Sequence, residues 1–269
     1  MQNIFTIDLE DWYQTESYRS KISISSWDAQ HCKLLESTLE MLFILRKYNT
    51  KATFFILAYN VKRHKEIISL IKRDNHEIAL HGYYHNLVFR QKPLEFRKEV
   101  EYSKKLLEDI YRTKIIGFRA PNWSIFPSCS WALEILRDLN FLYDSSMNEG
   151  IFKRNKYKIP KDLLEVPRST IDILYVSMPF AGGFFLRAYP YWLTRYLIRR
   201  KNYKNEEALV YTHPWEIENK QVLPRLSFLN EIKSSFRLSC TRNYLLNLLK
   251  DFKFNSIKNI FFNQNNDKT

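Results

Sequence analysis

The sequence predicts an α/β fold built on a mainly parallel sheet or barrel. Short apolar runs rich in β-branched and aromatic residues alternate along the chain with longer segments of helical period. Polar residues follow several of the apolar runs directly, and barrels of parallel strands keep their catalytic groups at these strand ends. With 269 residues, 45% of them hydrophobic, the chain can bury one substantial core, so we expect a single domain.

The apolar runs expected as strands are residues 4–7, 52–57, 77–80, 115–119, 141–143 and 209–212. Helical spacing between them predicts helices at 34–48, 61–74, 94–111 and 130–139. Pro160 and Pro167 interrupt the pattern, and we expect short strands and loops from 154 to 177. The tail from residue 224 is basic and helical in period. We therefore expect a domain of residues 1–220 with a basic helical C-terminal extension, residues 221–269, packed on it.

The cysteines and the amino terminus predict a cytoplasmic location. Three cysteines without paired spacing argue against a disulfide framework and favour a reducing compartment. The chain enters a strand-like run at Ile4, which leaves no room for a secretory signal sequence. No apolar run approaches the roughly 20 residues needed to span a bilayer.

The formal net charge of +13 calls for an explanation. The basic residues are scattered and accompany no helix-turn-helix, zinc-finger or aromatic RNA-binding motif, so no nucleic-acid partner is expected. Residues 189–201 mix aromatic and aliphatic side chains with a basic cluster, as interfacial helices do. This segment predicts either peripheral contact with the inner membrane face or an ordinary packed helix with a solvated basic end.

Two histidines four residues apart, His81 and His85, suggest a metal site. They follow the expected strand at 77–80, and an acidic cluster, Asp8, Glu10 and Asp11, follows the first strand. Two imidazole nitrogens and a carboxylate oxygen form the ligand set of hydrolytic zinc centres, in which a position stays open for water. The histidine spacing alone is weak evidence in a chain with six histidines, so the prediction rests on the combination.

Three further polar segments follow strand-like runs, at residues 117–124 (GFRAPNWS), 143–146 (YDSS) and 210–216 (VYTHPWE). In this order, the motifs resemble the polysaccharide deacetylases of the NodB-homology class, carbohydrate esterase family four. The DLEDW at residues 8–12 and the HPWE at 213–216 are most similar to the branch found in exopolysaccharide and O-antigen biosynthesis. The resemblance covers about residues 4–216 and implies a deformed (β/α) barrel with fewer than eight complete units.

The resemblance implies a role for each residue of the expected site. Asp8 would be the general base and His213 the proton donor to the leaving amine. Either Glu10 or Asp11 would complete the metal site with His81 and His85. Strand alternation puts Asp8 and Glu10 on one face, whereas a loop that begins at Leu9 could turn Asp11 inward. We list both and prefer Asp11, because the shorter side chain is the commoner ligand in the class.

Further residues would support the catalytic pair. Arg119 would hold Asp8 ionised through a bidentate contact, and Asp144 would orient His213 and raise its pKa. Asn122 and Trp123 would line the acetyl and sugar pocket, and Trp215 and Glu216 would shape its rim. Gly82 departs from the family by replacing the usual Ser or Thr after the first histidine, which puts the rigidity of that loop in doubt.

The favoured function is metal-dependent removal of acetyl from an N-acetylhexosamine unit of a glycan or a lipid-linked glycan precursor. Zinc suits the ligand set best, and cobalt, nickel or iron fit similar sets. The alternatives are a hydrolase of another amide, such as an N-formyl sugar or a small cyclic amide, and a glycan-binding protein derived from a deacetylase. The joint presence of a candidate base, acid and metal ligands argues against a pure binding protein.

Overall fold

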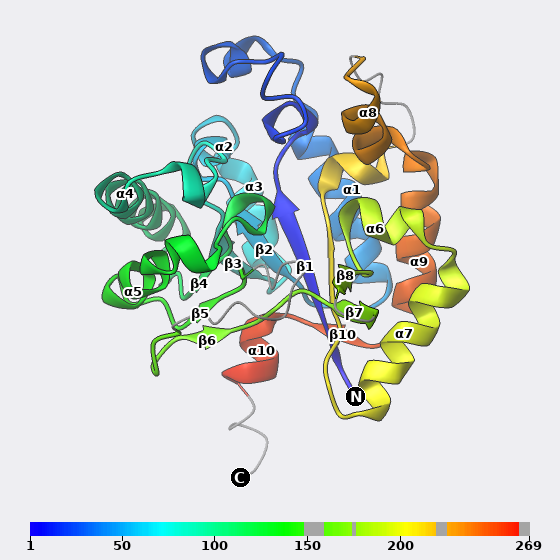
Figure 1. Cartoon of the computed structure of the whole chain (residues 1–269). Coiled ribbons are helices and arrows are strands. Elements are labelled where there is room, and N and C mark those ends of the chain that lie inside the picture. Colours follow the sequence, from blue (N-terminus) through cyan, green and yellow to red (C-terminus); the bar gives the residue numbers. More distant parts are fainter. Residues whose placement is uncertain (148–158, 174–175, 219–224, 264–269) are drawn as a thin grey trace.

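A curled parallel sheet forms the centre of the fold (Figure 1). The computed structural model describes residues 1–147, 159–173, 176–218 and 225–263. Within these residues, neighbouring strands follow the order β10-β1-β2-β3-β4-β5-β6, β9 also pairs with β1, and all these pairs are parallel. The strands are β1 (Asn3–Leu9), β2 (Thr53–Ile56), β3 (Glu77–Leu80), β4 (Gly117–Phe118), β5 (Tyr143–Asp144), β6 (Leu164–Glu165), β9 (Leu209–Thr212) and β10 (Phe254–Asn255).

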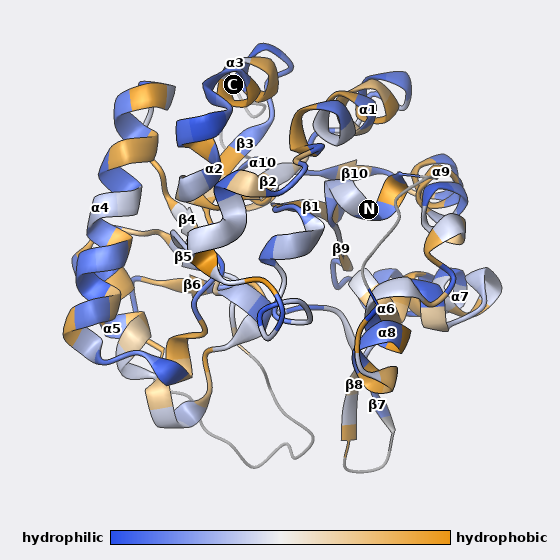
Figure 2. Cartoon of the chain, turned by 90° about the horizontal axis from the view of Figure 1, so that it is seen from above, coloured by the Kyte–Doolittle hydropathy of each residue, from blue (hydrophilic) through white to orange (hydrophobic). Residues whose placement is uncertain are grey.

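Helices surround the sheet, as the view from above shows (Figure 2). They are α1 (Leu34–Lys47), α2 (Ala58–Arg63), α3 (Lys65–Arg73), α4 (Pro93–Tyr111), α5 (Trp131–Asp138), α6 (Gly183–Ala188), α7 (Tyr191–Tyr203), α8 (Phe228–Ser235), α9 (Thr241–Asp251) and α10 (Ile257–Phe261). A separate antiparallel hairpin joins β7 (Thr170–Ile173) to β8 (Val176–Pro179). The expected α/β fold, a single-domain barrel with fewer than eight complete units, is confirmed as a curled half-barrel with surrounding helices.

The alternation of side chains along β1 explains where the site forms. Phe5, Ile7 and Leu9 pack outward in the large cluster shared with the helices. Ile4 faces the other way, into a smaller cluster inside the half-barrel together with Phe55. Thr6, Asp8 and Glu10 alternate with these outward residues and therefore lie on the same inner side as Ile4. Glu10 is the first residue after the carboxyl end of the strand. The strand pattern therefore sends its carboxylates to the interior at one end of the half-barrel.

The opposite end of the half-barrel is closed by α10. Ile257 and Ile260 join the inner cluster, and the backbone N–H of Ile257 donates to Thr53 Oγ1 over 2.9 Å. The N–H of Lys258 donates to the carboxylate of Glu77 over 2.8 Å. Since the amino end is filled, the carboxyl ends of the strands are left to form the cavity.

The sequence missed two features of the fold. The helix expected at 61–74 is two helices, α2 and α3, because the backbone leaves the helical region at His64, with φ −135° and ψ 61°. β10 pairs with β1 but has only two residues, too few to show an alternating pattern. α8 and α9 fall within the tail expected to be helical, whereas the proposed boundary between residues 220 and 221 lies outside the described residues.

In the described part of the chain, no helix is long and apolar enough to cross a membrane.

Candidate active site

Glu10, His81 and His85 meet at the carboxyl end of the sheet. One potential ligand atom from each lies within 4.8 Å of the others, and all three side chains are buried. Nε2 of His85 lies 2.8 Å from Glu10 Oε2, and Nε2 of His81 lies 4.0 Å from the same oxygen. This is the one group of at least three potential ligands found among the described residues.

The surroundings of these three side chains fit a metal ion. Nδ1 of His81 donates to the carbonyl of Arg119 over 2.8 Å, which fixes the tautomer and leaves Nε2 as the free lone pair. Burial lowers the pKa of His81 to about 4 despite the nearby Asp8 carboxylate, so the ring is neutral as a ligand requires. Glu10 Oε2 is buried, and although Nε2 of His85 lies 2.8 Å away, no hydrogen bond of good geometry reaches this oxygen, which leaves it available to a cation.

The loop that carries the histidines is fastened by Glu99 of α4. Gly82 adopts φ +80°, a left-handed conformation that glycine accepts readily. The next N–H, of Tyr83, donates to Glu99 Oε1 over 3.0 Å, and Asn86 Nδ2 donates to Glu99 Oε2 over 2.8 Å. Contacts with Glu99 thus hold the loop in a chain without the hydroxyl expected after His81. No sequence pattern indicated this role for Glu99.

Asp8 lies beside the candidate ligands and is held by Arg119. Arg119 Nη1 donates to Asp8 Oδ1 over 2.7 Å and to Thr6 Oγ1 over 2.8 Å. Its other nitrogens donate to the side chain and carbonyl of Ser145, over 3.0 and 3.3 Å, so the contact with Asp8 uses one nitrogen instead of two. Burial would raise the pKa of Asp8, but the Arg119 guanidinium together with His81 and His213 holds that pKa below its usual value.

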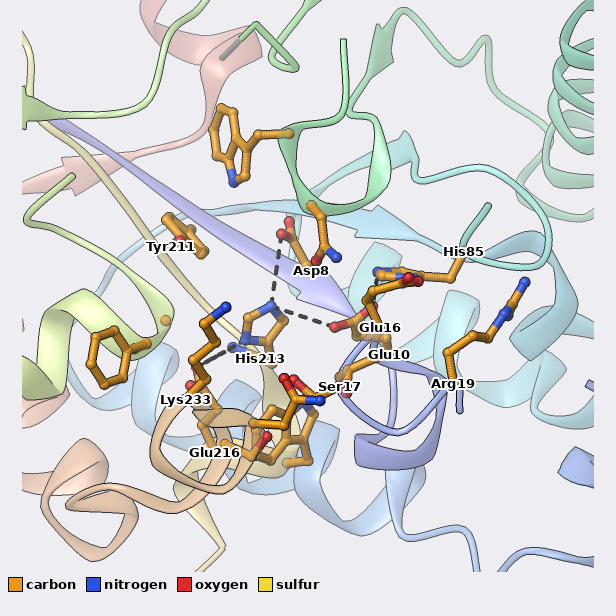
Figure 3. Close-up of a pocket in the computed structure, with 18 of the residues that line it drawn as sticks. Asp8, Glu10, Glu16, Ser17, Arg19, His85, Tyr211, His213, Glu216 and Lys233 are labelled. Carbon is orange, nitrogen blue, oxygen red and sulfur yellow. Dashed lines mark hydrogen bonds and ion pairs between the residues drawn. The ribbon is translucent and has the colours of Figure 1, made fainter. Parts of the chain in front are cut away.

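His213 faces both carboxylates from the end of β9. Its Nε2 lies 3.5 Å from Glu10 Oε1 and 4.0 Å from Asp8 Oδ2, and its Nδ1 lies 2.9 Å from Glu216 Oε2 (Figure 3). Trp215 stacks on the imidazole, with ring centroids 5.8 Å apart. Glu216 in turn forms a buried ion pair with Arg187 of α6.

This chain of charges sets the protonation of His213. Burial would lower its pKa, but the Glu216 carboxylate and the more distant Glu10 and Asp8 raise the pKa to about 9. Burial would likewise raise the pKa of Glu216, yet Arg187 and His213 lower it to about 2. His213 is therefore a protonated acid held next to ionised carboxylates, as a proton donor near neutral pH requires.

All of these groups open into one cavity of about 860 Å³. Its wall includes the candidate ligands, base and acid, together with Asn122, Trp123 and Trp215. Residues from α8 and from the loop after β1 complete the wall. A cavity of this size accommodates a sugar unit with its neighbours.

Two family descriptions match the chain. Residues 19–140 match the polysaccharide deacetylase family, and residues 146–262 match a domain of unknown function, DUF3473. Residues 19–140 are thus similar to a polysaccharide deacetylase domain. The family match contains the histidine loop and Arg119, whereas His213 and Glu216 lie in the second matched segment.

Relatives and solved structures agree with this assignment. A peptidoglycan-N-acetylglucosamine deacetylase of Bacillus cereus is 31% identical over 103 residues, which is 37% of each chain. A bifunctional xylanase/deacetylase of Pseudobutyrivibrio xylanivorans is 27% identical over 33% of this chain and 15% of its own length. These alignments span less than two fifths of either relative.

The deacetylase fold extends over nearly the whole chain. A Mycobacterium smegmatis protein classed as a polysaccharide deacetylase aligns with a TM-score of 0.59 and 20% identity, covering 96% of this chain and 87% of the other. A pseudoenzyme of carbohydrate esterase family four from Bacillus anthracis aligns with a TM-score of 0.54 and 16% identity, over 96% of this chain and 64% of the other. The fold is thus shared by a protein classed as a deacetylase and by a pseudoenzyme.

The preference for Asp11 as the metal carboxylate requires correction. Asp11 caps a short 3-10 helix (Trp12–Gln14): its Oδ1 accepts from the N–H of Trp12 over 2.8 Å and its Oδ2 from that of Lys33 over 3.0 Å. Both oxygens are thus occupied by backbone donors, away from the histidines. Glu10 faces the two histidines instead, because it alternates with Leu9 and lies on the same side of the chain as Asp8.

The role expected for Asp144 also requires correction. The carboxylate on Nδ1 of His213 belongs to Glu216. Asp144 is buried at the end of β5, where its Oδ2 accepts from the N–H of Ser146 over 3.0 Å. Ser146 Oγ in turn accepts from the N–H of Ala120 over 2.6 Å. Asp144 therefore supports the backbone next to Arg119 and does not orient His213.

The three residues expected to bind substrate all line the cavity, but their side chains differ in exposure. Asn122 is exposed, with φ +53°. Trp123 is 4% exposed and lies under the Arg119 guanidinium, whose Cζ is 4.4 Å from the centroid of the tryptophan ring. Little of the ring surface is therefore open to a sugar. Trp215 is 5% exposed and is stacked on His213.

Proposed function

We propose that this chain is a metal-dependent N-deacetylase that removes acetyl from an N-acetylhexosamine unit of a glycan or a lipid-linked glycan precursor. The observation that supports it most is the convergence of Glu10, His81, His85, Asp8 and His213 on one cavity of a deacetylase fold. A binding site for sugar would need neither an ionised aspartate nor a protonated histidine at this point.

Glu10, His81 and His85 are the residues that would hold a divalent metal. When bound, a metal such as zinc supplies acidification of a water and polarisation of the acetyl carbonyl. Cobalt, nickel and iron suit the same donor set, so the metal that is loaded depends on availability as well as on the site. The neutral His81 ring and the buried Glu10 oxygen, which faces Nε2 of both histidines, support this assignment.

The remaining residues account for the proton transfers. Asp8, ionised beside Arg119, accepts a proton from the attacking water as it adds to the acetyl carbon. His213, protonated through Glu216, gives its proton to the amide nitrogen as the C–N bond breaks. The products are acetic acid, which ionises to acetate, and the free amino sugar. The step leaves Asp8 protonated and His213 neutral, so release of the Asp8 proton to solvent and uptake of a proton by His213 restore the starting state.

A glycan precursor at the inner membrane face remains our proposal for the substrate and its location. It follows from the motif resemblance to the exopolysaccharide and O-antigen branch and from the net charge of +13. On α7, Trp192 and Tyr196 are 68% and 56% exposed, beside the exposed Arg199 and Arg200, which suits peripheral contact with an anionic membrane.

The first test is acetate release by the purified protein from a panel of N-acetylhexosamine glycans, including lipid-linked sugars. Asp8→Asn should retain metal and lose turnover, and His81→Ala should lose both. His31, an exposed histidine outside the cavity wall, provides the matched control, since His31→Ala should keep full activity. Metal-loaded wild-type protein that binds glycans but releases no acetate would instead favour the derived glycan-binding protein, and release of formate alone would favour a different amide.

A further inference from the structure

Helix α8 contributes a cation to the cavity that neither metal binding nor proton transfer uses. The helix lies at the end of the fold where β1 terminates (Figure 1), and Asn230, Lys233 and Ser234 line the cavity. Figure 3 shows the Lys233 side chain extending into the cavity on the side of Tyr211 and His213. Lys233 is exposed, so its amine is free to meet a ligand.

The other charges of the cavity wall are largely committed to partners. Arg187 pairs with Glu216. Arg90 pairs with Glu16, Nη1 to Oε1, at 2.6 Å. Arg19 donates to the carbonyl of Tyr84 and to the side chain of Asn86, over 2.9 and 2.8 Å. Arg168 also has partners of its own, including Trp123.

Lys233 differs from these cations because its side chain has no partner among the described residues, charged or neutral. Across the described ranges, the contact recorded for Lys233 is made by its backbone carbonyl, and no acidic side chain lies within ion-pair distance of its amine. The acids of the wall also have partners: Asp8 has Arg119, Glu10 has His85, Glu16 has Arg90, and Glu216 has Arg187. An oxyanion that enters the cavity would therefore find an uncompensated ammonium group.

The backbone of Lys233 is tied to the proton donor. Arg187 Nη2 donates to the carbonyl of Lys233 over 2.8 Å, while Arg187 Nη1 holds Glu216. Glu216 in turn contacts Nδ1 of His213 at 2.9 Å. The same buried arginine thus fixes the backbone of Lys233 relative to the acid that meets the leaving amine, so the lysine side chain enters the cavity from a fixed point of the chain.

We propose that Lys233 binds an oxyanion of the substrate, carried as a phosphodiester or a uronic acid carboxylate next to the N-acetyl sugar. The inference rests on the proposed deacetylation and names its substrate class, an acidic glycan or a phosphate-linked sugar in place of a neutral polymer. An ammonium–oxyanion hydrogen bond inside a cavity contributes about tenfold or more to binding. The preference should therefore be measurable as a ratio between matched compounds.

The test compares three N-acetylglucosamine compounds: the neutral methyl glycoside, a methyl phosphodiester at C1, and a disaccharide with glucuronic acid. The quantity measured is the ratio of kcat/KM for each anionic compound to that for the neutral one. We expect wild-type protein to favour one or both anionic compounds by about tenfold or more, mainly through KM. The compound that is favoured identifies the phosphate or the carboxylate as the source of the oxyanion.

Three variants separate a site from the general positive charge of the protein. Lys233→Gln should abolish the preference and Lys233→Arg should restore most of it. Lys204→Gln removes the same charge from an exposed position outside the cavity wall and should keep the wild-type ratio. An unchanged ratio in Lys233→Gln, or equal losses in Lys233→Gln and Lys204→Gln, would overturn the inference.

Calorimetric binding of the same compounds keeps this inference distinct from the proposed function. If no compound releases acetate but the anionic ones bind in a manner that depends on Lys233, the deacetylase proposal fails and the oxyanion site stands. If acetate is released from all three compounds at similar rates by wild-type protein, the oxyanion site fails and the deacetylase proposal stands.

Discussion

Replacing Glu216 with glutamine should lower the pKa of His213. A smaller fraction of His213 would then be protonated and able to act as the proton donor at alkaline pH. Glu216 Oε2 lies 2.9 Å from Nδ1 of His213, and both side chains are largely buried. A hydrogen bond to a charged group is worth about 1.5–3 kcal/mol, which corresponds to about one to two pKa units. The carboxylate favours the protonated ring, so the pKa of His213 should fall by this amount when glutamine removes the charge.

The assay is the pH dependence of kcat/KM for acetate release. A proton donor must be protonated, so activity is lost as the pH rises through its pKa and the alkaline limb reports that group. In Glu216→Gln this limb should move down by about one to two units, and at higher pH the rate should fall about 10- to 100-fold below wild type. Near the acid end of the profile, the two proteins should converge.

Two control experiments are needed to interpret this result. Asp144→Asn tests the residue that the sequence first suggested for this role and should leave the alkaline limb in place. The substitution at Glu216 also leaves the buried Arg187 without its carboxylate, so thermal unfolding must show that the variant is folded at the assay temperature. An alkaline limb that stays at the wild-type pH in folded Glu216→Gln would refute the assignment of Glu216 as the partner of His213.

Three further predictions follow from the buried charges. Glu10→Gln should weaken zinc binding about 100-fold or more in a competition titration, whereas Asp11→Asn should keep it and cost about 1 kcal/mol of stability as a lost cap; the reverse order would restore Asp11 as the ligand. Arg119→Met should cost about 3–5 kcal/mol in chemical denaturation, because Asp8 stays buried without its partner, and a loss below about 1 kcal/mol would contradict the pairing. Burial raises the pKa of Glu165 well above its usual 4.5, and the adjacent Asp144 raises it further. Because the fold favours the protonated form, the free energy of unfolding falls as pH rises above 4.5; Glu165→Gln should therefore gain stability relative to wild type between pH 5 and pH 8, and a constant difference would be evidence against the raised pKa.

Local patterns in the sequence were sufficient to predict the strands that carry the site. Six apolar runs lie at strands of the sheet, and the residues after β1, β3 and β9 meet because parallel strands end at the same edge. His81 and His85 could be paired from their spacing together with the acidic cluster that follows the first strand. The elements that need long-range pairing, such as the two-residue β10, carried no pattern of their own.

The assignments among neighbouring acids could not be predicted, because they depend on where a strand ends and a turn begins. Whether Glu10 or Asp11 faces the histidines follows from the 3-10 turn that Asp11 caps, with a donor from Lys33 in a distant segment. In the same way, the partner of His213 is Glu216, three residues away, because the chain turns back after Pro214. Lys233 reaches the cavity from a tail helix whose position only the tertiary structure shows.

The central claim is that Glu10, His81 and His85 hold the metal on which deacetylation depends. Its most direct test is the rate of acetate release as zinc is added in increments to chelated, metal-free wild-type protein, with an N-acetylhexosamine glycan as substrate. The account predicts negligible release without metal and a rate that rises to a plateau at one zinc per chain. Full activity in the metal-free protein would contradict it.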